Sequence, residues 1–209
     1  MLAPVPEAHA LLLGDSILDN RAYTGGGPDV AAQVRERGLR CTLAAVDGSV
    51  VADVTGQLAR APADATHLVV SAGGNDALRQ ESAIYHPARN VAEALLLLAT
   101  IVAEFRSAYT AMLDALASRR LPVAVCTVYD PAFPDRMRQR IAITGLALFN
   151  DVILREALAR GLTVLDLRLI CAAPADLANP IEPSSVGGAK IAAAVASFVA
   201  GSGPVLTGR

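Results

Sequence analysis

Hydrophobic residues gather in five short, continuous runs along the chain, separated by longer segments in which apolar positions recur with helical spacing. The runs do not alternate with polar residues, which is typical of strands in a parallel sheet covered on both faces. We therefore expect five buried strands, at His9–Leu13, Cys41–Val46, His67–Ser71, Pro122–Val128 and Leu162–Leu167.

The segments between these runs predict helices that end at Gly or Pro, the usual helix stops. They lie at Asp29–Arg37, Val50–Arg60, Ala88–Arg119, Ile141–Arg160 and Ser185–Val199. In the third, the run Leu95–Leu98 is expected to face the core, and Pro131–Met137 is expected to be a loop near the functional face.

Strands and helices alternate, which favours right-handed βαβ units and a sheet with helices on both faces. The fold class is therefore α/β, a three-layer α/β/α sandwich with a parallel, five-stranded sheet. Of the strand orders that fit this alternation, we expect the flavodoxin-like order 2-1-3-4-5. No linker divides the chain, so residues 1–209 are expected to form one domain.

Composition narrows the class of protein further. The chain is 53% hydrophobic and 18% charged with a net charge of −2, which excludes a wholly disordered chain and gives no basic stripe for a nucleic acid partner. Its three cysteines, Cys41, Cys126 and Cys171, form no close pair, so neither a disulfide framework nor a zinc site is expected. No apolar run is long enough to span a bilayer, and no basic region precedes the first one, so we expect a cytoplasmic protein without a signal peptide.

Chemistry-bearing residues follow three of the predicted strands. In an open parallel sheet, ligands bind outside the carboxyl ends of the strands. Gly14-Asp15-Ser16 follows the first strand, Gly48 lies after the second, and Gly73-Gly74-Asn75-Asp76 follows the third. Taken singly, each is also a common turn sequence. Together they offer a serine hydroxyl, backbone N–H groups and an amide donor, which are the groups that acyl transfer needs.

These residues together resemble the SGNH/GDSL hydrolase family. Gly14-Asp15-Ser16 matches its first block, Gly48 the second, and Asn75 the third. The resemblance extends to the last loop, Ile181–Ser184, and implies a flavodoxin-like fold without a metal or organic cofactor. It implies that Ser16 is the nucleophile, and that the Ser16 and Gly48 N–H groups and the Asn75 side chain form the oxyanion hole.

The last block departs from the family pattern, which is Asp-x-x-His followed by Pro. Here Asn179 stands in the Asp position and Glu182 in the position of the His, which is the general base. Glu182 could itself serve as the base if desolvation raised its pKa. Of the three histidines, His9 and His67 begin strands and should lie away from Ser16, whereas His86 could reach back from a loop.

The leading hypothesis is a serine hydrolase acting on small-molecule carboxylic esters or thioesters through an acyl-enzyme on Ser16, with Glu182 as the candidate base. Asp15, Asp76 and Tyr129 are candidate substrate-binding residues because they lie at strand ends. The alternative is an SGNH-fold binding protein with weak or no catalysis, suggested by Asn179 and Glu182. A nucleotide- or flavin-binding domain is disfavoured, because the first loop lacks a Gly-x-Gly-x-x-Gly run and a phosphate-binding Lys. The substrate and the oligomeric state stay open.

Overall fold

A computed structural model describes residues 8–201 and 206–207 of the chain. Five parallel strands form its sheet: β1 (His9–Gly14), β2 (Arg40–Leu43), β3 (His67–Ser71), β4 (Val123–Cys126) and β5 (Thr163–Leu165). They lie in the order β2-β1-β3-β4-β5, which confirms the predicted topology. A short strand β6 (Leu206–Thr207), absent from the prediction, pairs antiparallel with β5.

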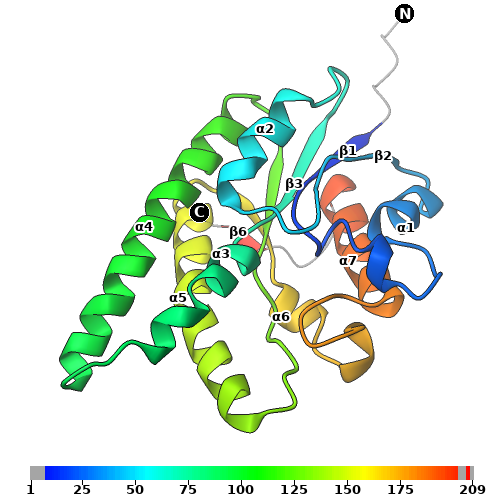
Figure 1. Ribbon diagram of the computed structural model, residues 1–209. Helices are drawn as coiled ribbons and strands as arrows, with labels where there is room; N and C mark the ends of the chain where they lie inside the picture. Colours follow the sequence, from blue (N-terminus) through cyan, green and yellow to red (C-terminus); the bar gives the residue numbers. More distant parts are fainter. Residues whose placement is uncertain (1–7, 202–205, 208–209) are drawn as a thin grey trace, which may run out of the picture.

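Helices cover both faces of the sheet, which confirms the three-layer sandwich (Figure 1). On one face lie α2 (Val54–Ala59), α4 (Val91–Ala117) and α5 (Arg136–Ala159). On the other lie α1 (Val30–Glu36), α6 (Leu167–Ile170) and α7 (Ser185–Val199). A short helix α3 (Gly74–Arg79) and 3₁₀ turns η1 (Arg21–Tyr23), η2 (Val51–Asp53), η3 (Glu81–Tyr85) and η4 (Pro174–Asp176) occupy the connections.

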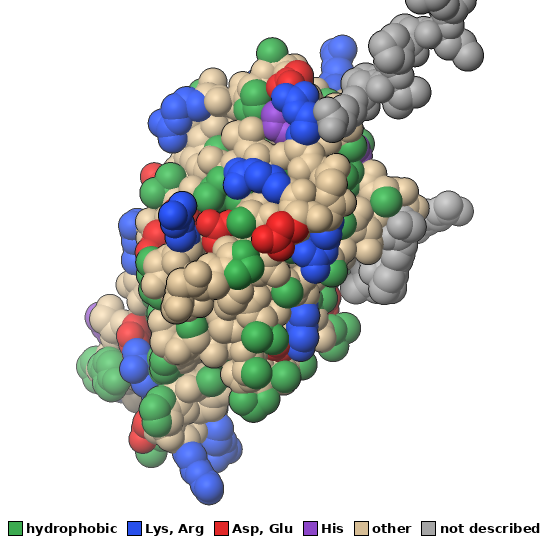
Figure 2. All heavy atoms as spheres, turned by 90° about the vertical axis from the view of Figure 1, so that its right-hand side faces the viewer, with side chains coloured by type: hydrophobic (Ala, Val, Ile, Leu, Met, Phe, Trp, Pro, Cys, Tyr) green, Lys and Arg blue, Asp and Glu red, His purple; other side chains and the backbone are tan. Residues whose placement is uncertain are grey.

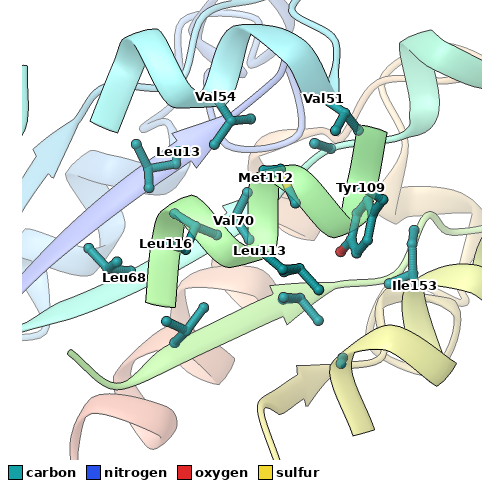
Figure 3. Close-up of a cluster of buried hydrophobic side chains, with 14 of the residues drawn as sticks. Leu13, Val51, Val54, Leu68, Val70, Tyr109, Met112, Leu113, Leu116 and Ile153 are labelled. Carbon is teal, nitrogen blue, oxygen red and sulfur yellow. The ribbon is translucent and has the colours of Figure 1, made fainter. Parts of the chain in front are cut away.

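The larger part of the core lies between the sheet and α2, α4 and α5 (Figure 3). Alternate residues of each strand, such as Leu11 and Leu13 of β1, point to this face, while Ala10 and Leu12 point to the other. On α4 the buried positions Tyr109, Met112, Leu113 and Leu116 recur at spacings of three and one, which places them on one stripe of the helix. Because few side chains are aromatic, the interior is built mainly from branched aliphatic residues.

The first half of α4 differs from the sequence prediction. Leu95 and Leu96 are 59% and 70% exposed, so the run Leu95–Leu98 is not a core stripe as a whole. Figure 1 shows the reason: the beginnings of α4 and α5 extend beyond the sheet, so no strand lies under them.

The helix α5 begins at Arg136, five residues before the predicted start. The Asp135 carboxylate accepts a hydrogen bond from the Arg138 N–H at 2.6 Å and so caps the helix. The predicted loop Pro131–Met137 is therefore wrong in its last two residues. Within the described part of the chain, no helix is long and apolar enough to cross a membrane.

Candidate active site

Ser16 lies directly beyond the carboxyl end of β1, on a turn that only glycine permits at position 14. Gly14 has a φ of +117°, and a Cβ there would lie 1.7 Å from the Ser71 backbone oxygen of the neighbouring strand. The Gln57 side chain holds both backbone polar groups of Gly14: its Oε1 accepts from the Gly14 N–H at 2.7 Å, and its Nε2 donates to the Gly14 carbonyl at 2.8 Å. The position of Ser16 is thus fixed by contacts from β3 and α2.

Asp15 lies beside Ser16 and lines the same cavity, but its carboxylate forms hydrogen bonds that stabilise the turn. Its Oδ1 accepts hydrogen bonds from the Ile17 N–H and from the Ser71 hydroxyl, both at 3.2 Å. Burial raises the pKa of Asp15 to about 7, and the hydrogen bonds only partly offset this. The predicted substrate-binding role of Asp15 stays a prediction.

Glu182 reaches the Ser16 cavity from the loop between η4 and α7. The Asn179 Oδ1 accepts hydrogen bonds from the backbone N–H groups of Ile181 and Glu182, at 2.9 and 3.0 Å. The Ala178 N–H donates to the Glu182 carbonyl at 2.9 Å, and the Tyr129 hydroxyl donates to the Ile181 carbonyl at 2.8 Å. Asn179, in the position where the family has Asp, therefore shapes the loop that presents Glu182.

The Glu182 carboxyl group is buried, and its pKa is raised to about 7. Burial is the main cause; a hydrogen bond with the Ser16 side chain lowers the pKa, and the negative charge of Asp47 raises it. Among the described residues, Glu182 Oε2 has no hydrogen-bond partner. A carboxylate with such a pKa can be ionised near neutrality and still accept a proton readily.

None of the three histidines lines the Ser16 cavity. His9 is buried at the start of β1 and contacts Asp64 at 3.2 Å and Thr42 at 2.8 Å. His67, at the start of β3, packs edge-on against Phe198. His86 follows η3 and is exposed. The one titratable side chain of the last block that faces Ser16 is Glu182.

Asn75 lies on the first turn of α3 and lines the same cavity as Glu182. Its side-chain NH₂ donates to the Ser49 carbonyl at 2.9 Å, which leaves a second N–H for a ligand. This bond ties Asn75 to the loop that holds Gly48. Gly48 has a φ of +81° and is exposed, and it is not among the cavity-lining residues.

The other two predicted substrate-binding residues have different surroundings. Tyr129 lines the cavity; it is buried, and burial raises the pKa of its phenol, which stays protonated as the donor to Ile181. Asp76 does not line the cavity: its carboxylate accepts a hydrogen bond from the Val51 N–H at 3.1 Å. Asp76 thus joins α3 to η2 rather than facing the Ser16 hydroxyl.

Ser16, Asn75 and Glu182 all line one cavity of about 160 Å³, and Ser16 and Asn75 lie at its end beside the strand termini. Away from these three residues its walls are almost wholly apolar and come from α3, η3, α4, α5 and the loop after β4. The site therefore combines a polar end at the strand termini with a hydrophobic body between helices.

The sequence resembles one protein family over most of its length. The family model for GDSL-like lipases/acylhydrolases matches residues 12–187, which covers the Gly14–Ser16 turn, Asn75 and Glu182.

The chain belongs to the GDSL-like lipase/acylhydrolase family.

Solved structures agree with this GDSL-like fold. An extracellular lipase from Streptomyces rimosus is 19% identical with a TM-score of 0.66, covering 94% of this chain and 100% of its own. A phospholipase A1 from Streptomyces albidoflavus is 16% identical with the same TM-score and the same coverage. An acetyl xylan esterase from Geobacillus stearothermophilus is 16% identical with a TM-score of 0.63, covering 96% of this chain and 99% of its own. No curated protein matches the chain by sequence.

Two parts of this GDSL-like site were not predicted from the sequence. The cavity walls on α4 and α5 were not predicted, because an apolar position on a helix fits a core contact as well as it fits a cavity wall. The role of Gln57 was also missed, since a glutamine within a helix has no sequence signal for a contact with a distant strand end. The Asn179-Pro180 pair, a common turn start, was the signal that could have indicated the Asn179 loop geometry.

Proposed function

We propose that this protein hydrolyses carboxylic esters or thioesters through an acyl-enzyme on Ser16. Membership of the GDSL-like lipase/acylhydrolase family supports a hydrolase. The observation that carries the proposal is that Ser16, Asn75 and Glu182 all line one largely apolar cavity.

In the proposed reaction, ionised Glu182 takes the proton of the Ser16 hydroxyl while the serine oxygen attacks the acyl carbon. The Asn75 side chain and the Ser16 N–H donate hydrogen bonds to the resulting oxyanion, and the Gly48 N–H, which does not line the cavity in this structure, joins them if its loop moves toward Ser16. The tetrahedral intermediate collapses, and the leaving alcohol or thiol takes the proton from Glu182. Glu182 then takes a proton from water, which attacks the acyl-enzyme and releases the acid, and Ser16 recovers its proton.

The buried position of Glu182 supports its assignment as the base. An exposed carboxylate has a pKa near 4.3 and is a weak base at neutrality. At this site burial raises the pKa to about 7, which lies near the optimum for proton transfer at neutral pH. His86 is exposed and does not line the cavity, so its imidazole does not face Ser16 in this conformation.

A second candidate function is that of an acyl-ligand-binding protein with weak or no catalysis. Two observations favour it: a carboxylate replaces the expected imidazole, and the Asn75 amide already donates to Ser49. Both functions would use the same cavity, so activity has to be measured directly.

A serine-directed fluorophosphonate probe separates the two candidates. We expect it to label the wild-type protein and the Ser107→Ala control, which removes an exposed hydroxyl from α4, but not Ser16→Ala. Hydrolysis of p-nitrophenyl esters should follow the same pattern. If the wild type neither reacts with the probe nor hydrolyses any ester, yet is thermally stabilised by fatty acids, the binding protein is the correct description.

A further inference from the structure

The apolar part of the cavity is much longer than an acetyl group needs. On α5 its lining residues run from Arg138 to Phe149, and on α4 from Leu98 to Val102. Hydrophobic residues of α3 and η3, among them Ala77, Leu78 and Ile84, close the side between them. A sugar would leave hydroxyl groups without partners along such walls, whereas an alkyl chain would gain free energy by burial.

A second, more open hollow adjoins the cavity near the beginning of α5. Five residues line both: Ile84, Leu98, Ile141, Gly145 and Leu148. The second hollow encloses about 590 Å³ and adds Arg136, Met137, Arg140 and Thr144 to the lining. We refer to the two adjoining hollows as the channel; its one end holds Ser16, and its other end lies where α4 and α5 extend beyond the sheet.

Exposed apolar side chains occur at and near the second hollow. Met137, which lines it, is 72% exposed, and Tyr85, next to the lining residue Ile84, is 79% exposed. At the lower end of the molecule, Figure 2 shows hydrophobic side chains beside Arg side chains. An alkyl chain longer than the channel would therefore meet an apolar surface where it emerges.

Gly145 lies in the interior of α5 and lines both hollows. A Cβ built at this position meets no atom within 4 Å, so the glycine is not required by close packing. Its φ is not positive, so the backbone does not require glycine either. Glycine within a helix destabilises it relative to alanine. What the absent side chain does leave is open space at the junction of the two hollows.

We propose that the channel binds the acyl chain of a medium- or long-chain substrate, and that Gly145 is the residue that keeps it open. This inference rests on the proposed function, since the acyl carbon is placed at Ser16. The polar end then holds the ester group, and the alkyl chain runs between η3, α4 and α5. The ion pair between Arg138 and Glu81, with nitrogen–oxygen distances of 2.8 and 2.9 Å, joins α5 to η3 alongside the channel.

The length of the channel indicates the size of the chain. From Arg138 to Phe149, α5 rises roughly 16 Å at 1.5 Å per residue. An extended polypeptide covers about 3.6 Å per residue, or about 1.2 Å for each of its three backbone bonds. An extended alkyl chain covers a similar length per C–C bond, so roughly twelve carbons fit along this part of α5. Acyl groups of about eight to twelve carbons should therefore bind best.

The test is a chain-length series of p-nitrophenyl esters from acetate to dodecanoate, kept below their micelle concentrations. For the wild type we expect kcat/KM to rise by up to about fourfold for each added CH₂, which corresponds to about 0.8 kcal/mol of burial. Gly145→Leu, which places a branched side chain in the junction, should lower the decanoate-to-acetate ratio of kcat/KM at least tenfold. Ala147→Leu adds the same side chain to an exposed position of α5 and should leave this ratio unchanged.

A binding measurement without turnover completes the test. In a Ser16→Ala background, decanoate should raise Tm, and the added Gly145→Leu change should abolish this rise. Leucine is a better helix former than glycine, so the Tm of Gly145→Leu without ligand should not fall, which shows that the variant folds.

The outcomes distinguish the channel from the proposed function. If the wild type hydrolyses acetate better than decanoate, or if Gly145→Leu keeps the wild-type ratio, the channel proposal is overturned while the esterase stands. If no ester is hydrolysed but decanoate stabilises Ser16→Ala and not the double variant, the proposed function fails and the acyl channel stands.

Discussion

The ionisation of Glu182 should control the rate of the proposed reaction, because only its carboxylate form can take the Ser16 proton. With a pKa of about 7, Glu182 is about one-tenth ionised at pH 6, half at pH 7 and nine-tenths at pH 8. We therefore expect kcat/KM for an activated ester to fall about tenfold per pH unit below 7 and to level off above 8. Asp15 also has a pKa of about 7, which is raised mainly by burial and to a smaller extent by the charge of Glu182.

Glu182→Gln is the decisive variant, because it keeps the shape of the side chain and removes its ability to accept a proton. General-base catalysis contributes about 10²- to 10⁴-fold, so kcat/KM should fall by that factor and lose the rise through pH 7. The fold should survive, since glutamine removes a group whose burial as a charge is unfavourable. The assay is p-nitrophenyl butyrate hydrolysis between pH 5.5 and 9, with Tm measured for each variant.

His86→Ala serves as the control for the alternative base. His86 is exposed and does not line the cavity, so this variant should keep the wild-type rate and pH profile. Wild-type activity in Glu182→Gln together with a loss in His86→Ala would refute the assignment and show that the loop after η3 rearranges to bring His86 to Ser16.

Two further predictions concern residues that support the site. The pKa of Asp15 is about 7 in the folded chain and 3.8 when unperturbed. Between these pH values the folded state holds a proton that the unfolded state has lost, so the free energy of unfolding decreases as the pH rises from about 4 to 7. Asp15→Asn should therefore raise the free energy of unfolding at pH 8 by up to ~4 kcal/mol and change it little at pH 4, measured by urea denaturation; equal effects at both pH values would contradict the raised pKa. Asn179→Ala removes the acceptor for two N–H groups of the Glu182 loop and should lower kcat about tenfold or more with a small loss of Tm, because misplacing a catalytic group is costly. Asn179→Asp keeps that acceptor and should keep the activity, and a loss as large as that of the alanine variant would refute a role through loop geometry.

Much of the fold follows from local sequence patterns. The continuous apolar runs located all five parallel strands. Their alternation with helices fits more than one strand order, and the flavodoxin-like order 2-1-3-4-5 is the one that the structure confirms. The errors have local causes. The cap at Asp135 starts α5 earlier than the apolar pattern does, and the leucines at 95 and 96 lie on a part of α4 that extends beyond the sheet.

The candidate site was predictable to a different degree for each residue. Ser16 and Asn75 lie at strand ends, where the geometry of a parallel sheet brings them together, and they line one cavity. Gly48 lies on the neighbouring loop, but its exposure and the Asn75–Ser49 hydrogen bond depend on side-chain positions that no local pattern encodes. Asp76 also lies at a strand end, yet a hydrogen bond to Val51 turns its carboxylate to another loop.

The sequence by itself determined the layers of the fold and the turn that presents Ser16, because these depend on periodicity, on strand-end geometry and on a glycine that no other residue can replace. The tertiary structure decided the ionisation of Glu182 and the shape of the cavity. A pKa depends on the burial of the carboxyl group and on charges from distant segments, such as Asp47. The channel exists because two helices extend past the sheet and one of them lacks a side chain at Gly145, an arrangement that arises only when the whole chain is packed.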